Sequence, residues 1–324
     1  MRWAVAHDPD AVVLGAMPAG VPADVPAGIP GVGAAYGLRL GDVPGAAHLL
    51  GAPVGDETAW TVRRVLDPAP DPDLDDAEDG AEDVVGPEQA RHPLADGGWA
   101  VVDRRSATTT LWTPRPVRDA EVVHPYLAST AVVVAHWQGR LALHAGAVLL
   151  SVGSTGAVVA VLGARDAGKS TTTWALRQAG CPLVTDDVLV LDPHGHRVWP
   201  GPGCVDLRAG AAGHFEVGEA LGVVGRRERW RVAAGDGELP ARLHLAAVVE
   251  PVWGEPAVED VPVPERLALL AGALALRVAP ADPGALLRLL ALPFLRWRRP
   301  RDFTALPAAV TDLLGALRAR VPGA

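Results

Sequence analysis

Short apolar runs separated by Pro and Gly dominate the first third of the chain. Residues 99–103 and 108–112 are two such runs, rich in Val, Thr and Trp, with turn residues between them. This pattern predicts a small β-rich domain over residues 1–122. Residues 67–83 interrupt the pattern with nine acidic side chains and no basic one. Such a segment buries too little apolar surface to fold, which favours a solvated loop and leaves a partner-docking segment as the alternative.

The pattern of apolar positions changes after residue 123. Residues 124–137 are crowded with apolar side chains over a helical length, and the β-branched runs 145–152 and 157–162 predict a hairpin whose second strand leads into a glycine-rich loop. Together with the segments that follow, this predicts an α/β domain over residues 123–324. Further helices are expected at residues 170–179, 264–276, 283–292 and 306–319, and further strands at 183–187, 188–191 and 243–252.

Length and composition indicate the number of domains, the kinds of partner and the location of the protein. A length of 324 residues favours two domains, and a net charge of −9 argues against nucleic-acid or anionic-membrane partners. No apolar run is long enough to span a bilayer. The acidic N-terminus does not resemble a signal peptide, and the two cysteines suit a reducing compartment. These features predict a cytoplasmic protein and leave its oligomeric state open.

Lys169 is the only lysine of the chain, although Lys and Arg together number 29. Since arginine supplies positive charge elsewhere, this ammonium indicates a site where a planar guanidinium does not fit. It lies in a G-x-x-x-x-G-K-S motif between a predicted strand and a predicted helix, the context of a loop that holds nucleotide phosphates. The alternative is that the glycines only turn the chain. The residues expected to bind a nucleoside triphosphate are Gly163, Ala164, Arg165, Asp166, Ala167, Gly168, Lys169, Ser170 and Thr171.

Two adjacent carboxylates, Asp186 and Asp187, follow a predicted strand 17 and 18 residues after Lys169. The returning strand should bring them to the sheet edge that carries the glycine-rich loop. One carboxylate, Asp186, can hold Mg²⁺ with the Ser170 hydroxyl, while Asp187 accepts a proton from an attacking hydroxyl. The alternative is an aspartate pair that caps a turn.

These motifs resemble the HPr kinase/phosphorylase-like serine kinases, whose phosphate-loop core is akin to that of phosphoenolpyruvate carboxykinase. The resemblance covers roughly residues 123–210. It implies a P-loop α/β core of that type beside the smaller β-rich N-terminal domain, with ATP and Mg²⁺ as cofactors. It also implies catalytic roles for Lys169, Asp186, Asp187 and His144. Without the resemblance, the apolar neighbours of His144 would favour a buried core histidine. The matching segments are residues 140–146, 163–171, 179–180 and 183–187.

The chain also departs from that family's pattern. Arg165 and Asp166 stand where the family has Ser-Gly, Thr171 stands where it has Glu, and residues 201–208 do not match its substrate-gripping loop. The chain looks more like divergent actinobacterial members, some of which phosphorylate a serine of a precursor peptide. We therefore expect an ATP-dependent kinase acting on a serine or other hydroxyl of a peptide or protein. The alternatives are a small-molecule kinase and a nucleotide-binding regulatory protein with little turnover.

Two arginine-rich segments, residues 226–231 and 296–301, are expected to be solvated surface. The alternative is that one arginine of the first segment reaches the γ-phosphate. The histidines of residues 194–196 are expected to lie in an exposed turn rather than to bind a metal. An acidic Asp166 beside a triphosphate has no explanation in the sequence, unless it points outward or pairs with Arg165.

Overall fold

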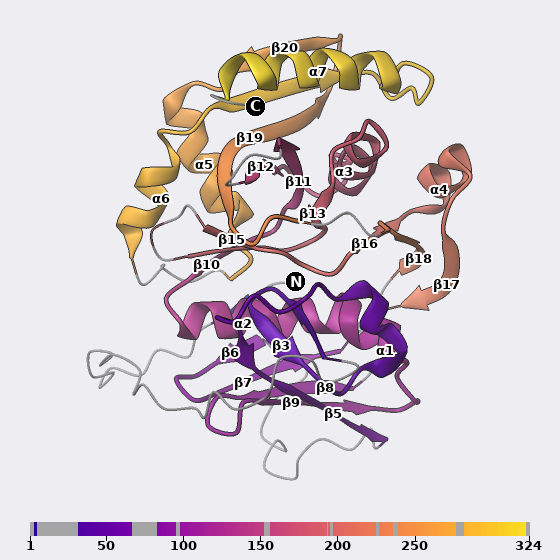
Figure 1. The fold of residues 1–324 in the computed structure, drawn as a ribbon, viewed down its shortest axis with the longest axis vertical. Helices are drawn as coiled ribbons and strands as arrows, with labels where there is room; N and C mark the ends of the chain where they lie inside the picture. Colours follow the sequence, from indigo (N-terminus) through magenta and orange to yellow (C-terminus); the bar gives the residue numbers. More distant parts are fainter. Residues whose placement is uncertain are drawn as a thin grey trace.

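The computed structural model describes residues 3–4, 32–66, 83–94, 98–151, 156–192, 194, 197–224, 227–235, 239–276 and 282–321. Over these residues the protein is a mixed α/β structure with several sheets and helices (Figure 1). Most of the acidic segment 67–83, residues 152–155 of the predicted hairpin, Arg226 and His196 lie outside the described residues.

Two sheets with both parallel and antiparallel strand pairs form the N-terminal part of the structure. In the six-stranded sheet the order is β1-β6-β7-β8-β9-β5, and in the three-stranded sheet it is β2-β3-β4. Their strands are β1 (Trp3–Ala4), β2 (Gly33–Ala35), β3 (Leu38–Leu40), β4 (Thr58–Ala59), β5 (Thr61–Leu66), β6 (Asp83–Val85), β7 (Gln89–Pro93), β8 (Trp99–Asp103) and β9 (Thr108–Thr113), and the 3₁₀ segment η1 (Pro44–Leu49) lies between β3 and β4.

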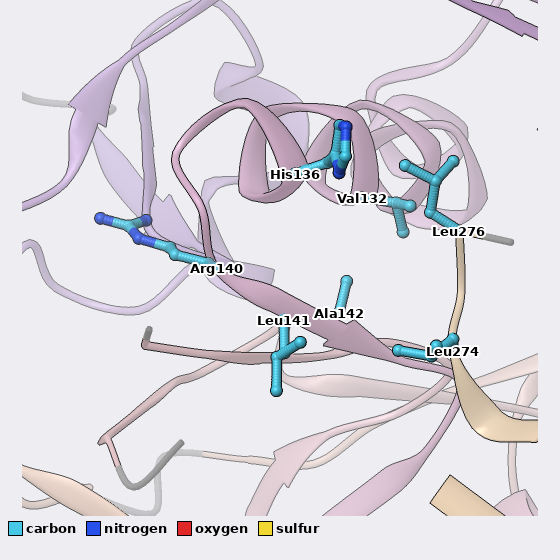
Figure 2. A pocket seen from close by; sticks show the side chains of 7 residues that line it. All are labelled: Val132, His136, Arg140, Leu141, Ala142, Leu274 and Leu276. Atoms are coloured by element: carbon cyan, nitrogen blue, oxygen red, sulfur yellow. The ribbon is translucent and has the colours of Figure 1, made fainter. Parts of the chain in front are cut away.

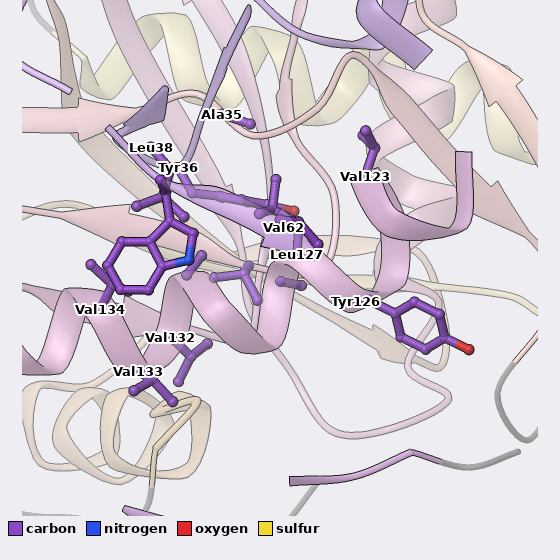
Figure 3. Close-up of a cluster of buried hydrophobic side chains, with 14 of the residues drawn as sticks. Ala35, Tyr36, Leu38, Val62, Val123, Tyr126, Leu127, Val132, Val133 and Val134 are labelled. Carbon is purple, nitrogen blue, oxygen red and sulfur yellow. The ribbon is translucent and has the colours of Figure 1, made fainter. Parts of the chain in front are cut away.

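Helix α2 (Leu127–Trp137) follows the short α1 (Asp119–Glu121) and the π-helical turn η3 (Val122–Tyr126). Its first nine residues are all buried, because it packs against the N-terminal strands on one side and against β10 and β14 on the other. Figure 3 shows part of this cluster, with Leu127, Val132, Val133 and Val134 on α2 and Leu38 and Val62 on the N-terminal strands. The helix thus joins one apolar cluster that also includes Val190 and Trp199 from the following part of the chain.

A nine-stranded sheet organises the rest of the chain, in the order β10-β14-β15-β19-β12-β11-β13, with β21 pairing β19 and β20 pairing β21. Helices α3 and α7 cover one face of this sheet and α5 and α6 cover the other. The elements are β10 (Leu141–Leu143), β11 (Gly146–Ser151), β12 (Gly156–Val161), β13 (Leu183–Thr185), β14 (Leu189–Leu191), β15 (Arg197–Trp199), β19 (Leu243–Trp253), β20 (Ala257–Asp260), β21 (Phe294–Arg299), α3 (Lys169–Gln178), α5 (Val263–Ala273), α6 (Pro283–Leu289) and α7 (Leu306–Arg320).

The directions of the strands bring the carboxyl ends of several strands to one edge of this sheet. β12 and β19 are parallel, β19 and β21 are parallel, and β11 runs antiparallel to both of its neighbours β12 and β13. The carboxyl ends of β13, β12, β19 and β21 therefore share an edge, the usual place for a ligand site in an α/β sheet.

A small fourth sheet, in the order β16-β18-β17, and helix α4 lie beside this edge. The apolar pattern does not predict these elements, because β16 has four residues, β17 has Glu and Gly among its apolar residues, and β18 is rich in arginine. The expectation that both arginine clusters are solvated is wrong for Arg231 and Arg299, which are buried. The elements are β16 (Cys204–Leu207), α4 (Ala209–Phe215), β17 (Glu219–Val224) and β18 (Arg227–Ala233). Within the described residues, every helix is too short or too polar to cross a bilayer.

Candidate functional site

The glycine-rich loop joins the end of β12 to the start of α3, as the sequence pattern predicts. Gly163, Asp166 and Gly168 have φ values of +146°, +68° and +84°, so the loop depends on left-handed backbone conformations. A Cβ added at Gly168 would collide with the Arg299 guanidinium. The Lys169 ammonium donates hydrogen bonds to the carbonyl oxygens of Gly163, at 3.0 Å, and Ala164, at 3.2 Å. The lysine side chain thus folds back over its own loop.

Arg299, at the end of β21, supports the glycine-rich loop through hydrogen bonds. Its Nη2 donates to the carbonyl oxygen of Ala167 at 3.2 Å and to the Thr172 hydroxyl at 3.4 Å. The guanidinium lies 4.0 Å from the ring centroid of Trp253, a cation–π contact. Burial lowers the pKa of Arg299 to about 10, so the group stays charged at neutral pH. A second fixed cation therefore lies close to the loop.

Asp186 lies directly after β13 and is almost fully buried, at 4% exposure. Its Oδ2 accepts a hydrogen bond from the Asp206 backbone N–H at 3.3 Å, and the Ser170 hydroxyl also bonds to this carboxyl. Its Oδ1 is buried without a hydrogen-bond partner among the described residues. Burial, with the nearby charges of Asp187 and Asp206, raises the pKa of Asp186 to about 7. An unsatisfied buried oxygen is costly unless a ligand or water pairs with it.

Asp187 has a φ of +76°, a conformation that turns its side chain away from that of Asp186 and toward His144. The Asp187 Oδ1 and the His144 Nδ1 are 3.2 Å apart. Burial favours the neutral acid, but the positive charges of His144, His124 and the neighbouring arginines hold the pKa of Asp187 below its usual value. Asp187 is thus ionised at neutral pH. The His144 side chain is 47% exposed, so its interpretation as a core histidine is wrong.

Asp206, which the sequence reading did not single out, anchors the arginines of β18. Its carboxylate accepts bonds from Arg231 Nε at 2.8 Å and Nη2 at 3.0 Å, and from Arg229 Nη1 at 3.0 Å. Arg231 also donates to the backbone carbonyl oxygen of His124 at 2.7 Å. These arginines, with His124, keep the pKa of Asp206 below its usual value although burial opposes this. The cluster holds the backbone N–H that bonds to Asp186.

The side chain of Asp166 forms an ion pair with Arg208, at the start of α4. Both side chains are 57% exposed, so the pair lies at the solvent boundary of the site. This contact explains how an acidic residue is tolerated in a loop suited to phosphate: a cation from a distant segment neutralises it. The partner is Arg208 and not Arg165.

A single cavity of about 380 Å³ joins these groups. It brings the loop lysine, the two carboxylates and His144 together, and it adds cations from two further segments, Arg208 and Arg227. Gly163, Ala164 and Ala167 form the backbone of the loop and are not among the lining residues. The lining residues are His144, Gly146, Arg165, Asp166, Gly168, Lys169, Ser170, Thr171, Asp186, Asp187, Asp206, Leu207, Arg208, Gly210, Ala211, Arg227, Trp253 and Phe303.

A much smaller pocket lies between α2 and β10 (Figure 2). Its volume of about 20 Å³ has room for one water molecule. Apolar side chains form most of its wall, with His136 and Arg140 as its polar members. The pocket offers no set of groups for catalysis, which leaves the larger cavity as the candidate site.

The residues that could hold Mg²⁺ are Ser170 and Asp186. A hydroxyl, together with a carboxylate that has one unsatisfied oxygen, is a donor set that suits this cation, which takes its other ligands from water and phosphate oxygens. In the part of the chain that the structure describes, no group of three or more His, Cys, Asp or Glu side chains is arranged to bind a metal.

The burial of Asp186 predicts that the stability of the metal-free protein depends on pH. Because its pKa of about 7 in the folded protein lies above the ordinary value of 3.8, the folded protein binds this proton more tightly than the unfolded chain. The free energy of unfolding should therefore fall by about 1 kcal/mol per pH unit between about pH 4 and pH 7 from this group. Above that range the group adds no further slope.

Urea unfolding of the wild type and of Asp186→Asn, measured from pH 4.5 to pH 8, checks this. The contributions of the other titrating groups cancel when the free energies of unfolding of the two proteins are subtracted. The wild type should therefore lose stability relative to the variant as pH rises to 7. Asp312→Asn, at an exposed position on α7, should keep the wild-type slope. Parallel curves for the wild type and Asp186→Asn would contradict the prediction.

Comparisons with known proteins add little to this description. No protein-family model and no curated protein matches the chain. Among solved structures, the HPr(Ser) kinase/phosphatase from Coxiella burnetii is similar to 55% of this chain and 90% of its own, with 14% sequence identity and a TM-score of 0.27. A similarity this low shows nothing about the activity of this chain.

Proposed function

We propose that the protein is an ATP-dependent phosphotransferase of the HPr kinase-like type, with a P-loop core, that transfers the γ-phosphoryl group to a serine or other hydroxyl of a peptide or protein. One observation carries the proposal. The lysine of the glycine-rich loop and the His144–Asp187 pair, which come from different strand ends, line the same cavity. A loop that only turned the chain, or an aspartate pair that only capped a turn, would not require this convergence.

The loop supplies the phosphate-binding groups. Backbone N–H groups of residues 164–170 and the start of α3 provide partial positive charge, which suits an anion. The Lys169 ammonium, now bonded to two loop carbonyl oxygens, moves to the β- and γ-phosphates when ATP binds. Arg208 and Arg227 also line the cavity and offset the charge that develops on the transferring group.

Asp187 performs the proton transfer in this proposal. The acceptor hydroxyl gives its proton to the Asp187 carboxylate as its oxygen forms a bond to the γ-phosphorus, and the bond from that phosphorus to the β–γ bridging oxygen breaks. ADP leaves with the bridging oxygen. Because cations hold the pKa of Asp187 below its usual value, the carboxylate is ionised at neutral pH and has a lone pair for the proton, and His144 orients it through the 3.2 Å contact.

Ser170 and Asp186 would hold Mg²⁺ at the same site. When bound, this ion neutralises charge on the phosphate oxygens. A bound cation also favours the ionised form of Asp186, whose pKa is otherwise raised to about 7. Asp186 therefore serves the metal and Asp187 serves the acceptor, so the two carboxylates have different roles.

The other predictions made from the sequence accompany this proposal. They are the division into domains at residues 122 and 123, a peptide or protein acceptor, a cytoplasmic location, and the absence of nucleic-acid and membrane partners. Helix α2 begins after that division and shares one apolar cluster with the N-terminal strands.

The proposal is tested by incubating the protein with Mg²⁺, γ-labelled ATP and a panel of serine-containing peptides. Label on a peptide hydroxyl, recovered as phosphoserine, is the expected result. Label on a small alcohol but on no peptide would instead favour a small-molecule kinase. ATP binding with no transfer to any acceptor, water included, would indicate a regulatory nucleotide-binding protein and contradict the proposal.

A further inference from the structure

Two aromatic side chains, Trp253 and Phe303, are among the residues that line the cavity. Trp253 lies at the end of β19, and Phe303 follows β21. In the sheet order, β19 lies on one side of β12 and β13 lies on the other side, beyond β11. The end of β12, with its glycine-rich loop, therefore lies between Trp253 at the end of β19 and Asp186 after the end of β13.

Trp253 is held in a fixed position beside the loop. A Cβ built on Gly168 would lie 3.5 Å from the indole Cη2, so the ring is next to the last loop residue before α3. The buried Arg299 guanidinium, 4.0 Å from the ring centroid, bonds to the loop as well. Trp253 is only partly buried, and its accessible surface contributes to the cavity wall.

Phe303 is supported from behind in a similar way. The His214 ring stacks on it, with centroids 4.6 Å apart and planes 14° apart, and Phe215 meets it edge-on at 6.2 Å. The remaining surface of the partly buried Phe303 contributes to the cavity wall. The small residues Gly210 and Ala211 of α4 line the same cavity and leave room for a planar group.

We infer that Trp253 and Phe303 form the subsite for the nucleobase, and that this subsite favours purines. This inference rests on the proposed function. If the γ-phosphate lies beside Asp187, a nucleotide that follows the loop places its nucleoside on the other side of the loop, where β19 ends at Trp253, and Phe303 lines the same cavity. Aromatic rings hold bases by stacking, and the larger purine ring covers more of the aromatic surface than a pyrimidine does.

The test compares ligands with and without a base. Calorimetric titration with Mg²⁺ should show that the wild type binds ATP about 10- to 100-fold more tightly than tripolyphosphate, and more tightly than CTP. Trp253→Ala and Phe303→Ala should each remove most of this ATP advantage and leave tripolyphosphate affinity unchanged. Trp253→Phe retains a flat aromatic face and should recover much of the ATP affinity.

Trp112→Ala serves as the matched control, because Trp112 is also partly buried and lies on β9, outside the cavity. It should bind ATP like the wild type. Equal wild-type affinities for ATP and tripolyphosphate would overturn the base subsite and leave the phosphate site standing. If Trp253→Ala loses affinity for ATP and for tripolyphosphate by the same factor, Trp253 only supports the loop, and the inference is overturned. A wild type that binds neither ligand would overturn the proposed function and this inference together.

Discussion

Asp187→Asn is expected to transfer phosphate about 1000-fold more slowly than the wild type while it binds ATP equally well. The asparagine keeps the size of the side chain and a polar contact with His144, which lies 3.2 Å from the carboxylate, but it cannot accept the proton of the attacking hydroxyl. Label transfer to a peptide measures the loss, and release of inorganic phosphate measures it when water is the acceptor. Calorimetry measures ATP binding.

Asp312→Asn is the control for this variant, because it removes one carboxylate at an exposed position of α7. It should keep full transfer activity. The outcome that would remove the proton-acceptor role is a fully active Asp187→Asn. A variant that loses ATP binding in parallel with transfer would point instead to an electrostatic role for Asp187 in holding the nucleotide complex.

The second large effect is expected at Lys169. Lys169→Ala removes the ammonium that lies over the loop, and ATP affinity should fall about 30- to 100-fold, the value of a hydrogen bond from a charged group. Lys169→Arg keeps the charge, but its longer planar guanidinium does not fit where Nζ now lies, 3.0 Å and 3.2 Å from two loop carbonyl oxygens. It should bind ATP nearly as poorly as the alanine variant.

Arg318→Ala controls for the loss of one positive charge, since Arg318 is exposed on α7. Its ATP affinity should match that of the wild type. If Lys169→Arg binds ATP with wild-type affinity, the shape argument for the only lysine of the chain fails. If Lys169→Ala does so, the loop does not bind phosphate through this residue.

Local sequence patterns predicted the elements that carry the loop and the carboxylates. The run before Gly163 is apolar and β-branched, and the structure has β12 there; the helix expected at residues 170–179 is α3, from Lys169 to Gln178. The expected strand at residues 183–187 ends two residues early, because Asp186 and Asp187 turn the chain at the sheet edge. Signals of this kind depend only on neighbouring residues, so a single sequence carries them.

The supporting residues could not be predicted in this way. Arg299 contacts the loop from 131 or 132 positions away, and Asp206 holds Asp186 from 20 positions away. Both contacts depend on which strands become neighbours in the sheet, and spacing along the chain does not give that order. The arginine-rich strand β18 also resembles a surface strand by composition, although its Arg229 and Arg231 form ion pairs with the buried Asp206 side chain.

Helix α2 has a consequence for how the molecule unfolds. Its buried side chains belong to a single apolar cluster that includes strands from before residue 122 and from after residue 140, so neither part can lose its structure without exposing the apolar surface of the other. Cooperative units follow such continuous packing rather than the order of elements along the chain. The described parts of the chain should therefore melt as one unit, with a single calorimetric transition.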